Sequence, residues 1–249
     1  KPNKCFAGFA DWVSDARRAG DADPRKKVLA DARKLTGNSA FGITGMNKKK
    51  HQSVIYATDV KKAKKKVSSW LFRDLNEIEQ SGDGETVFEI RSGKKVINQN
   101  KPCQVAAAVY QLAKLRMLQF YYHCLAKYID RSDFQLLEMD TDSMYMGLSD
   151  ESFEALIKPE MRAEWEQEKH KWFPDNSTPE RAAYTRRTPG LFKQEWKGDE
   201  MVCLTKKSYY CHGTEEKNKM ASKGIQARNN ADILTLEKYK EALYGRKII

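Results

Sequence analysis

The sequence predicts an α+β fold, in which helices pack against antiparallel strands, rather than a doubly wound parallel sheet. Two observations favour this class. Segments with apolar residues at helical spacing alternate with short segments bounded by turn residues, which predict antiparallel hairpins. The chain has 249 residues, of which 40% are hydrophobic, so it suffices for one large domain or two small ones. No apolar run is long enough to cross a bilayer, and we expect no membrane partner.

The charge balance favours a polyanionic partner. Lys and Arg exceed Asp and Glu by 11, and an excess of this size is typical of proteins that bind nucleic acid. A soluble protein with a lysine-rich face would have the same total. Charge alone therefore leaves both interpretations open.

The cysteine pattern favours a reducing, intracellular compartment. The five cysteines are odd in number and include no C-x-x-C pair, which argues against a disulfide framework. The spacing of Cys203, Cys211 and His212 matches no zinc pattern, so we expect no metal there. The chain starts at Lys1 without a signal-peptide pattern, and we expect it to be a piece of a longer polypeptide. The nucleus is compatible with this composition, although the compartment is not fixed by it.

A first helix is predicted from Asp23-Pro24 through "PRKKVLADARKLTGNSAFG". At about 100° per residue, one stripe of this helix carries lysines, an amide and a ring: Lys27, Lys34, Asn38 and Phe41. The neighbouring stripe is apolar and would face a core: Val28, Ala32 and Leu35. The alternative is a solvated face with one misplaced aromatic side chain.

Lysines dominate residues 48–66, in the runs "KKK" and "KKAKKK". The second run is predicted to begin a helix that continues through Trp70 and Leu71. Its lysines, among them Lys61, Lys64 and Lys65, would contact the phosphate backbone of a nucleic acid. The alternatives are a solvated helix face and a localisation signal.

The remaining elements are predicted from turn signals and periodicity. "SGDGE" is predicted to turn between a helix and a strand, and "TVFEI" to pair with "KKVIN" across "RSG". The clearest helix follows Pro102 and is about 40 Å long. Its predicted core face consists of Val105, Val109, Leu112, Leu115, Leu118, Tyr122, Leu125 and Ile129.

Downstream of this helix, residues 150–173 predict two charged surface helices, broken at Pro159. "LFKQEW" and "EMVCLT" predict a second hairpin, which would turn at Lys197-Gly198-Asp199. A final helix is predicted from about Thr235.

The stretch "LEMDTDSMYMGL" places two aspartates, one residue apart, between apolar flanks of a predicted strand. Residues i and i+2 of a strand share a face, so Asp140 and Asp142 are expected to project together beside a tight turn. Paired carboxylates with water access are typical Mg²⁺ ligands. A calcium loop is disfavoured because Met144 and Tyr145 stand where a ligand and a glycine are needed. The structural alternative is a pair of turn aspartates that cap a hairpin.

Three motifs follow one another along the chain. "KLTGNSAFG" matches K-x-x-x-N-S-x-[YF]-G, "DTDS" begins at Asp140, and "KKSY" begins at Lys206. In this order, and over roughly Asp23 to Asn230, the chain resembles the family B DNA polymerases. The segments "LLEMDTDSMYMGL" and "LTKKSYYC" are similar to those of polymerases from self-synthesising DNA transposons and related viruses.

The resemblance implies a polymerase palm, whose antiparallel sheet is backed by helices, with a helical fingers segment and the start of a thumb. The fingers would occupy residues 1–50, the palm 51–210 and the thumb 211–249. Residues 150–188 would be a lineage-specific insertion in the palm. The implied reaction is template-directed addition of dNMP to a primer 3′ end by a two-metal mechanism with Mg²⁺. The implied partners are primer–template DNA and dNTP, and a terminal protein as primer stays open.

The resemblance also implies roles for the residues of the palm motifs. Asp142 would be the principal metal ligand and Asp140 a weaker or supporting one. Lys206, Lys207 and Tyr209 would hold the primer strand by phosphate contact, hydrogen bonding or packing.

The fingers motif would contact the incoming nucleotide. Lys34 would bind its phosphates, where a flexible point charge suffices. Asn38 and Phe41 would border the nascent base pair, and Gly42 would let the backbone come close to it.

Three departures from the family pattern limit these roles. Phe41 stands where Tyr is usual, and Glu138 and Met139 stand where a pair such as Tyr-Gly is common. The family's upstream motif D-x-x-S-L-Y-P is missing, as are the acidic motifs of the exonuclease. The chain therefore holds half of the two-metal site, and alone we expect it to be inactive.

Two rival functions remain at this point. One is a non-catalytic DNA-binding relic of such a polymerase. The other is a reverse transcriptase, which is disfavoured because its palm typically has adjacent aspartates, whereas Thr141 separates the two here.

Overall fold

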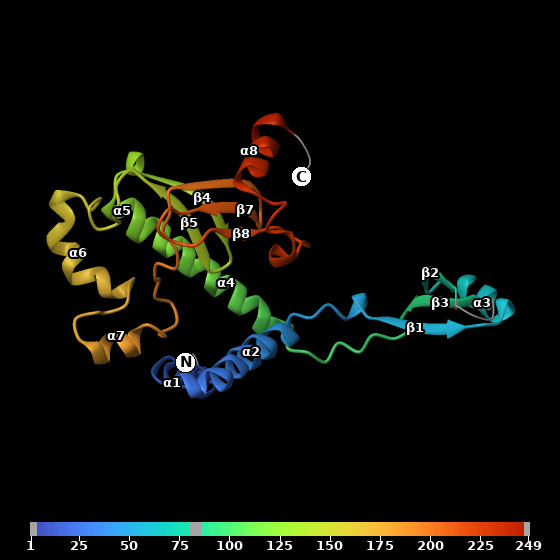
Figure 1. The fold of residues 1–249 in the computed structure, drawn as a ribbon. Helices are drawn as coiled ribbons and strands as arrows, with labels where there is room; N and C mark the ends of the chain where they lie inside the picture. Colours follow the sequence, from blue (N-terminus) through green and yellow to red (C-terminus); the bar gives the residue numbers. More distant parts are fainter. Residues whose placement is uncertain (1–3, 80–85, 247–249) are drawn as a thin grey trace. The chain divides into compact units, whose positions relative to one another are not determined.

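Helices and antiparallel strands make up the computed structural model, which describes residues 4–79 and 86–246 (Figure 1). This mixture confirms the predicted α+β class. The helices are α1 (Ala7–Ala22), α2 (Lys27–Thr44), α3 (Val60–Val67), α4 (Cys103–Phe120), α5 (Ala126–Tyr128), α6 (Arg162–Glu168), α7 (Pro179–Thr185) and α8 (Leu236–Gly245). The strands are β1 (Gln52–Ala57), β2 (Phe72–Glu79), β3 (Thr86–Gly93), β4 (Phe134–Asp140), β5 (Ser143–Leu148), β6 (Glu200–Thr205), β7 (Ser208–His212) and β8 (Lys219–Ala221).

The strands form three antiparallel sheets in two compact units. Unit 1 contains the residues up to Lys34 and those from Val109 onward, whereas unit 2 contains Leu35–Ala108. The sheets β4-β5 and β6-β7-β8 belong to unit 1, and the sheet β1-β3-β2 belongs to unit 2. Two helices, α2 and α4, carry the chain between the units. The bounds of fingers, palm and thumb stay a prediction.

The main core of unit 1 forms around the end of α4. Phe120 stacks on Phe192, with ring centroids 4.1 Å apart, and meets Trp172 edge-on. Tyr128 is 1% exposed and packs against Trp165. Because Trp165, Trp172 and Phe192 come from the segment after β5, this segment is part of the core rather than a surface excursion.

A smaller core in unit 1 lies between α8 and the β6-β7-β8 sheet. Val202, Leu234 and Tyr239 are buried in it. The hydroxyl of Tyr239 donates a hydrogen bond to the carbonyl of Ala221, at 3.1 Å. The α8 helix begins after Thr235, which accepts from an amide of the first turn, so the predicted final helix is confirmed.

In unit 2, helix α3 packs on the three-stranded sheet. Ala63 on α3, Ala57 on β1 and Ile90 on β3 form its buried centre. The carboxylate of Asp59 accepts from the amide of Lys61 at 2.8 Å and thereby caps the helix. The helix ends at Val67, so the prediction that it continues through Trp70 and Leu71 is wrong.

The long helix after Pro102 is confirmed, but its predicted core face is wrong. Leu125 and Ile129 are buried, whereas the residues from Val109 to Tyr122 on the predicted stripe are exposed. The buried face instead carries Ala106, Met117, Phe120, Cys124 and Tyr128. The helix is apolar on most sides, and the π-helical turn η3 (Tyr121–Leu125) shifts its phase after Phe120.

Two predicted hairpins are also wrong. "TVFEI" and "RSG" form one strand, β3, which pairs with β1 and β2 instead of with "KKVIN". "LFKQEW" forms no strand, and β6 pairs with β7 across Lys206-Lys207. The strand β2 precedes "SGDGE" where we expected a helix, while residues 80–85 of that turn lie outside the described residues. Before Pro159 the chain forms turns and a single bridge from Ile157 to Ile129 instead of a helix.

None of the helices within 4–79 and 86–246 has the length and apolar character that crossing a membrane requires.

Candidate functional site

Two tight hairpins of unit 1 meet at their tips. In the first, Asp140 pairs with Ser143, so Thr141 and Asp142 form a two-residue loop between β4 and β5. In the second, Thr205 pairs with Ser208 across the loop Lys206-Lys207, which joins β6 to β7. The motifs "DTDS" and "KKSY" thus occupy equivalent positions, each around the turn of a hairpin.

Both loops contain a non-glycine residue with positive φ. Thr141 has φ 32° and Lys207 has φ 60°. This region is unfavourable for residues with a Cβ, and most of all for a β-branched one such as Thr141. Such strain often accompanies functional sites, where the surrounding contacts hold the backbone in place.

Lys207 links the two tips through its side chain and its backbone. Its ammonium group lies 2.9 Å from a carboxylate oxygen of Asp140. Its amide donates to the carboxylate of Glu138 at 3.1 Å. The hydrogen bond from Lys207 lowers the pKa of Asp140, and the charge of Lys206 adds to this. The same bond raises the pKa of Lys207. Both groups are accessible to water, so the pair contributes little to stability but fixes the geometry.

A pair of tyrosines continues the contact along the strands. The hydroxyls of Tyr145 on β5 and Tyr209 on β7 lie 3.2 Å apart, and their ring centroids 5.0 Å apart. Burial is the main cause that raises the pKa of both phenols. The ammonium of Lys219 lies 5.3 Å from the centre of the Tyr145 ring. The predicted site residue Tyr209 is therefore half-buried and stays a neutral hydrogen-bonding group.

Asp142 lies in the loop rather than on the strand. The expectation that Asp140 and Asp142 share a strand face is therefore wrong, because β4 ends at Asp140. Asp142 is exposed, and its charge acts on Lys207. Its amide donates to the carbonyl of Asp140, which closes the turn.

The tip of the first hairpin fits part of a Mg²⁺ site. It offers hard carboxylate oxygens with access to water, as this ion prefers. One oxygen of Asp140 is engaged by Lys207, so Asp142 has the more accessible carboxylate. Within the described residues, no group of three or more His, Cys, Asp or Glu side chains is placed to hold a metal.

The fingers-motif residues lie on α2, as the sequence predicts, but on both sides of the unit boundary. Lys34 belongs to unit 1, whereas Asn38, Phe41 and Gly42 belong to unit 2. Lys34 is within electrostatic range of Glu195, whose charge also acts on Tyr145. This relation connects Lys34 to the residues near the hairpin tips.

The lysines of α3 form a separate basic surface in unit 2. Ala63 faces the sheet, and the lysines of "VKKAKKKV" cover the remaining sides of this helix. Lys61, Lys64 and Lys65 are exposed, and no ion pair involves them in the part of the chain that the structure describes. Their charge is therefore available to a polyanion.

Sequence reasoning missed three residues near the hairpin tips: Glu138, Tyr145 and Lys219. The period of two along a strand relates Glu138 to Asp140, which could have indicated that carboxylate. The contact of Tyr145 and Lys219 with the second hairpin depends on the meeting of two sheets. No local sequence signal reports such a contact.

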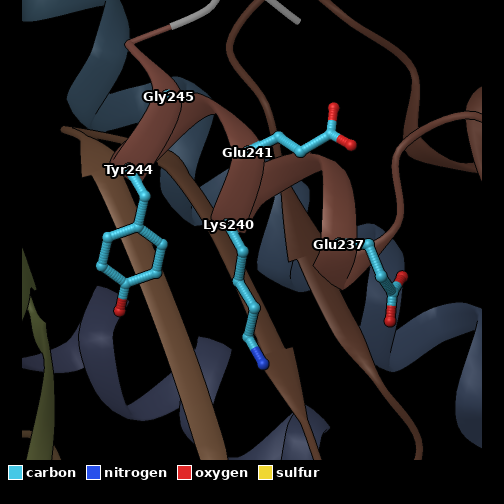
Figure 2. A pocket seen from close by; sticks show the side chains of 5 residues that line it. All are labelled: Glu237, Lys240, Glu241, Tyr244 and Gly245. Carbon is cyan, nitrogen blue, oxygen red and sulfur yellow. The ribbon is translucent and has the colours of Figure 1, made fainter.

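A shallow recess of about 410 Å³ lies along α8 (Figure 2). Its side chains come from Glu237, Lys240, Glu241 and Tyr244. Lys240 pairs with Glu200 at 2.7 Å and Glu241 with Lys238 at 3.3 Å, so the lining offers no unpaired cation among the described residues. This recess is unsuited to an anionic ligand.

Comparisons with known proteins assign neither a family nor a function to this site. No protein-family model matches the chain, and neither a curated protein nor a solved structure matches it.

Proposed function

We propose that this chain belongs to a family B DNA polymerase and contributes to a palm that adds dNMP to a primer 3′ end on a DNA template. The observation that supports this most is the meeting of the "DTDS" and "KKSY" hairpins, bridged by Asp140 and Lys207 at 2.9 Å. The sequence motifs alone do not require that contact. A lysine that contacted a primer phosphate at this point would place the strand beside the carboxylates proposed to hold Mg²⁺.

In this proposal, Asp142 and Asp140 hold Mg²⁺ together with a further carboxylate from outside the described residues. Mg²⁺ held there would supply charge stabilisation for phosphoryl transfer. Lys207 places the primer strand next to the carboxylates, and Lys206 adds positive charge. Tyr209, fixed by Tyr145, supports the same strand from β7.

The nucleotide and the duplex would contact other parts of the chain. Lys34 binds the phosphates of the incoming nucleotide, and Asn38, Phe41 and Gly42 border the base pair. The α3 lysines, including Lys61, supply affinity for duplex that does not depend on sequence.

Primer extension by the product of the complete reading frame tests the proposal. Because a metal ligand contributes several kcal/mol to transition-state stabilisation, Asp142→Asn should lower the extension rate by about a thousandfold. DNA binding should stay within about twofold, since the substitution removes negative charge only. Asp150→Asn, another exposed carboxylate, is the matched control and should extend as wild type.

Wild-type extension by Asp142→Asn would show that the metal assignment is wrong. DNA and RNA templates tested side by side would separate a DNA-directed enzyme from a reverse transcriptase.

One observation favours a second candidate, the non-catalytic DNA-binding relic. Among the described residues no third metal-ligating side chain joins Asp140 and Asp142, and Lys207 already neutralises Asp140. This candidate predicts DNA binding that weakens with salt, and no Mg²⁺-dependent extension by the complete protein.

A further inference from the structure

A basic recess in unit 1 lies away from the residues that the metal assignment uses. It has a volume of about 490 Å³ and lies between α1, the first half of α2 and the residues that follow α7. Five cationic side chains line it, against two carboxylates, Asp21 and Asp31. The cations are Arg17, Lys27, Lys34, Arg186 and Arg187.

One of the two carboxylates is held by the arginines. The guanidinium of Arg187 donates to both carboxylate oxygens of Asp21, with 2.5 Å between Nε and Oδ2. This bond is the main cause that lowers the pKa of Asp21, and the charges of Arg186 and Arg17 contribute. The carboxylate of Asp21 therefore lies where the positive charges of Arg17, Arg186 and Arg187 act together on one anion.

The other four cations form no ion pair among the described residues. Across the described ranges, no carboxylate lies within ion-pair distance of Arg17, Lys27, Lys34 or Arg186. A planar guanidinium matches carboxylate and phosphate equally well, because both accept two parallel hydrogen bonds. A ligand with several linked phosphates could therefore take Arg187 from Asp21 and engage the unpaired cations together.

The segment that carries Arg186 and Arg187 is anchored by contacts on both sides of the pair. Arg18 donates to the carbonyl of Tyr184 at 3.1 Å, and its guanidinium lies 4.1 Å from the centre of that ring. Beyond the pair, Arg116 donates to the carbonyl of Gly190 at 2.8 Å. Arg186 and Arg187 are thus carried by a segment fixed at both ends, which keeps their charges in place without a ligand.

We infer that this recess binds the polyphosphate of a nucleotide, with Asp21 as an internal competitor for Arg187. The inference rests on the proposed function, to which it adds Arg186, Arg187, Lys27 and Asp21. These residues lie outside the motifs that carry the family resemblance. A recess of about 490 Å³ is of the size that small-ligand sites have, whereas a nucleic-acid strand needs an extended groove that follows its backbone.

Calorimetric titration of the 249-residue chain with inorganic pyrophosphate tests the inference. Arg187→Ala and Arg186→Ala should each weaken binding by about tenfold, because each removes charge-assisted hydrogen bonds to phosphate. Asp21→Asn should tighten binding severalfold, since the amide competes less well for Arg187.

The matched controls come from the same segment. Arg181 and Asp175 form an ion pair at 2.9 Å outside the recess. Arg181→Ala and Asp175→Asn should leave pyrophosphate affinity unchanged. Because Asp21→Asn predicts a gain in affinity, poor folding of an arginine variant cannot imitate the expected pattern.

Competition experiments separate the sources of phosphate. Displacement of pyrophosphate by dATP supports the inference, whereas displacement by a DNA duplex but not by dATP overturns it. Unchanged affinity in Arg186→Ala and Arg187→Ala, or weaker binding in Asp21→Asn, also overturns it.

The outcome is independent of the extension assay. If Asp142→Asn extends as wild type while pyrophosphate binding follows Arg187, the proposed function fails and the anion site stands. If extension depends on Asp142 and pyrophosphate does not bind, the recess assignment alone fails.

Discussion

The chain contains two lysine-rich regions that differ in how their charge is placed. Lys207 at the β6–β7 turn is bound by Asp140, and its backbone is held by Glu138. The α3 lysines surround a short helix, and no carboxylate pairs with Lys61, Lys64 or Lys65 among the described residues. The first arrangement fixes the position of one cation, whereas the second leaves exposed cations that no ion pair holds within the described part of the chain.

This difference implies two modes of binding a nucleic acid. A compensated lysine adds little to non-specific affinity, because DNA must first displace its carboxylate. It does define where a strand would lie relative to Asp142. Uncompensated lysines contribute affinity through counterion release, with no requirement for position. We therefore expect the two regions to respond differently to substitution.

The largest effect should come from the α3 surface. Replacement of the five α3 lysines by Gln should lower affinity for a DNA duplex by about a hundredfold at low salt. The slope of log K against log salt should decrease in magnitude by about 4, since each phosphate contact contributes about 0.9. Fluorescence anisotropy over a range of salt concentrations measures both.

The matched control for this series is Lys207→Gln, which should change the slope by less than about 1. If Lys207→Gln weakened binding as much as the α3 variant, the proposed difference between the regions would be wrong.

A smaller effect should follow when the compensation is removed from Lys207. Asp140→Asn frees its ammonium group, so DNA affinity should rise by about twofold to threefold. In the Asp140→Asn background, Lys207→Gln should then lower DNA affinity by a larger factor than it does in the wild-type chain. Non-additive binding free energies in this double-mutant cycle, measured by anisotropy, would confirm the coupling. Strict additivity would contradict it.

The ion pair of Asp140 and Lys207 predicts that the stability of the chain depends on pH. Because the pKa of Asp140 is lowered in the folded chain, its contribution to stability is present above the ordinary Asp value of 3.8. That contribution is lost as pH falls through the lowered folded value. The difference in melting temperature between wild type and Asp140→Asn should therefore shrink on acidification, as thermal unfolding at several pH values would reveal. A difference that grew instead would contradict the assigned direction.

An effect of similar, small size concerns the strained loop. Asn tolerates positive φ better than a β-branched residue, so Thr141→Asn should stabilise the chain by about 0.5–1 kcal/mol. Chemical denaturation measures this difference. Ser53→Asn, which changes an exposed residue of a strand outside the loop, is the control and should bring no gain. A loss of stability in Thr141→Asn would show that φ at this position is not a source of strain.

The sequence predicted the helix-forming segments better than the sheets. Pro24 and Thr235 mark helix starts through local chemistry that a short window contains. In contrast, β2 was missed because a bulge between Phe72 and Asp74 interrupts the alternation of apolar and polar residues. The core face of α4 was wrong because apolar residues occupy most sides of this helix, so helical spacing alone did not single out the buried side.

The same distinction applies to the candidate site, where local spacing predicted some features and the packing of two sheets decides others. The stripe from Lys34 to Phe41 follows from helical spacing, and the structure places these residues on one helix. The contact between Asp140 and Lys207 joins two hairpins far apart in the sequence, so it depends on how two sheets pack. Motif order indicated that these residues belong together, but no local pattern could give their geometry.

The most direct test of the account is Mn²⁺-induced broadening of the amide NMR signals of the chain, with this ion as a paramagnetic substitute for Mg²⁺. Manganese binds the same oxygen donors, and its broadening reports proximity. We predict selective loss of the signals around Asp142 and, because the hairpin tips touch, of those around Lys207. Asp142→Asn should restore both sets. Broadening that spares both loops, or that persists unchanged in Asp142→Asn, would contradict a metal site at the meeting point of the two hairpins.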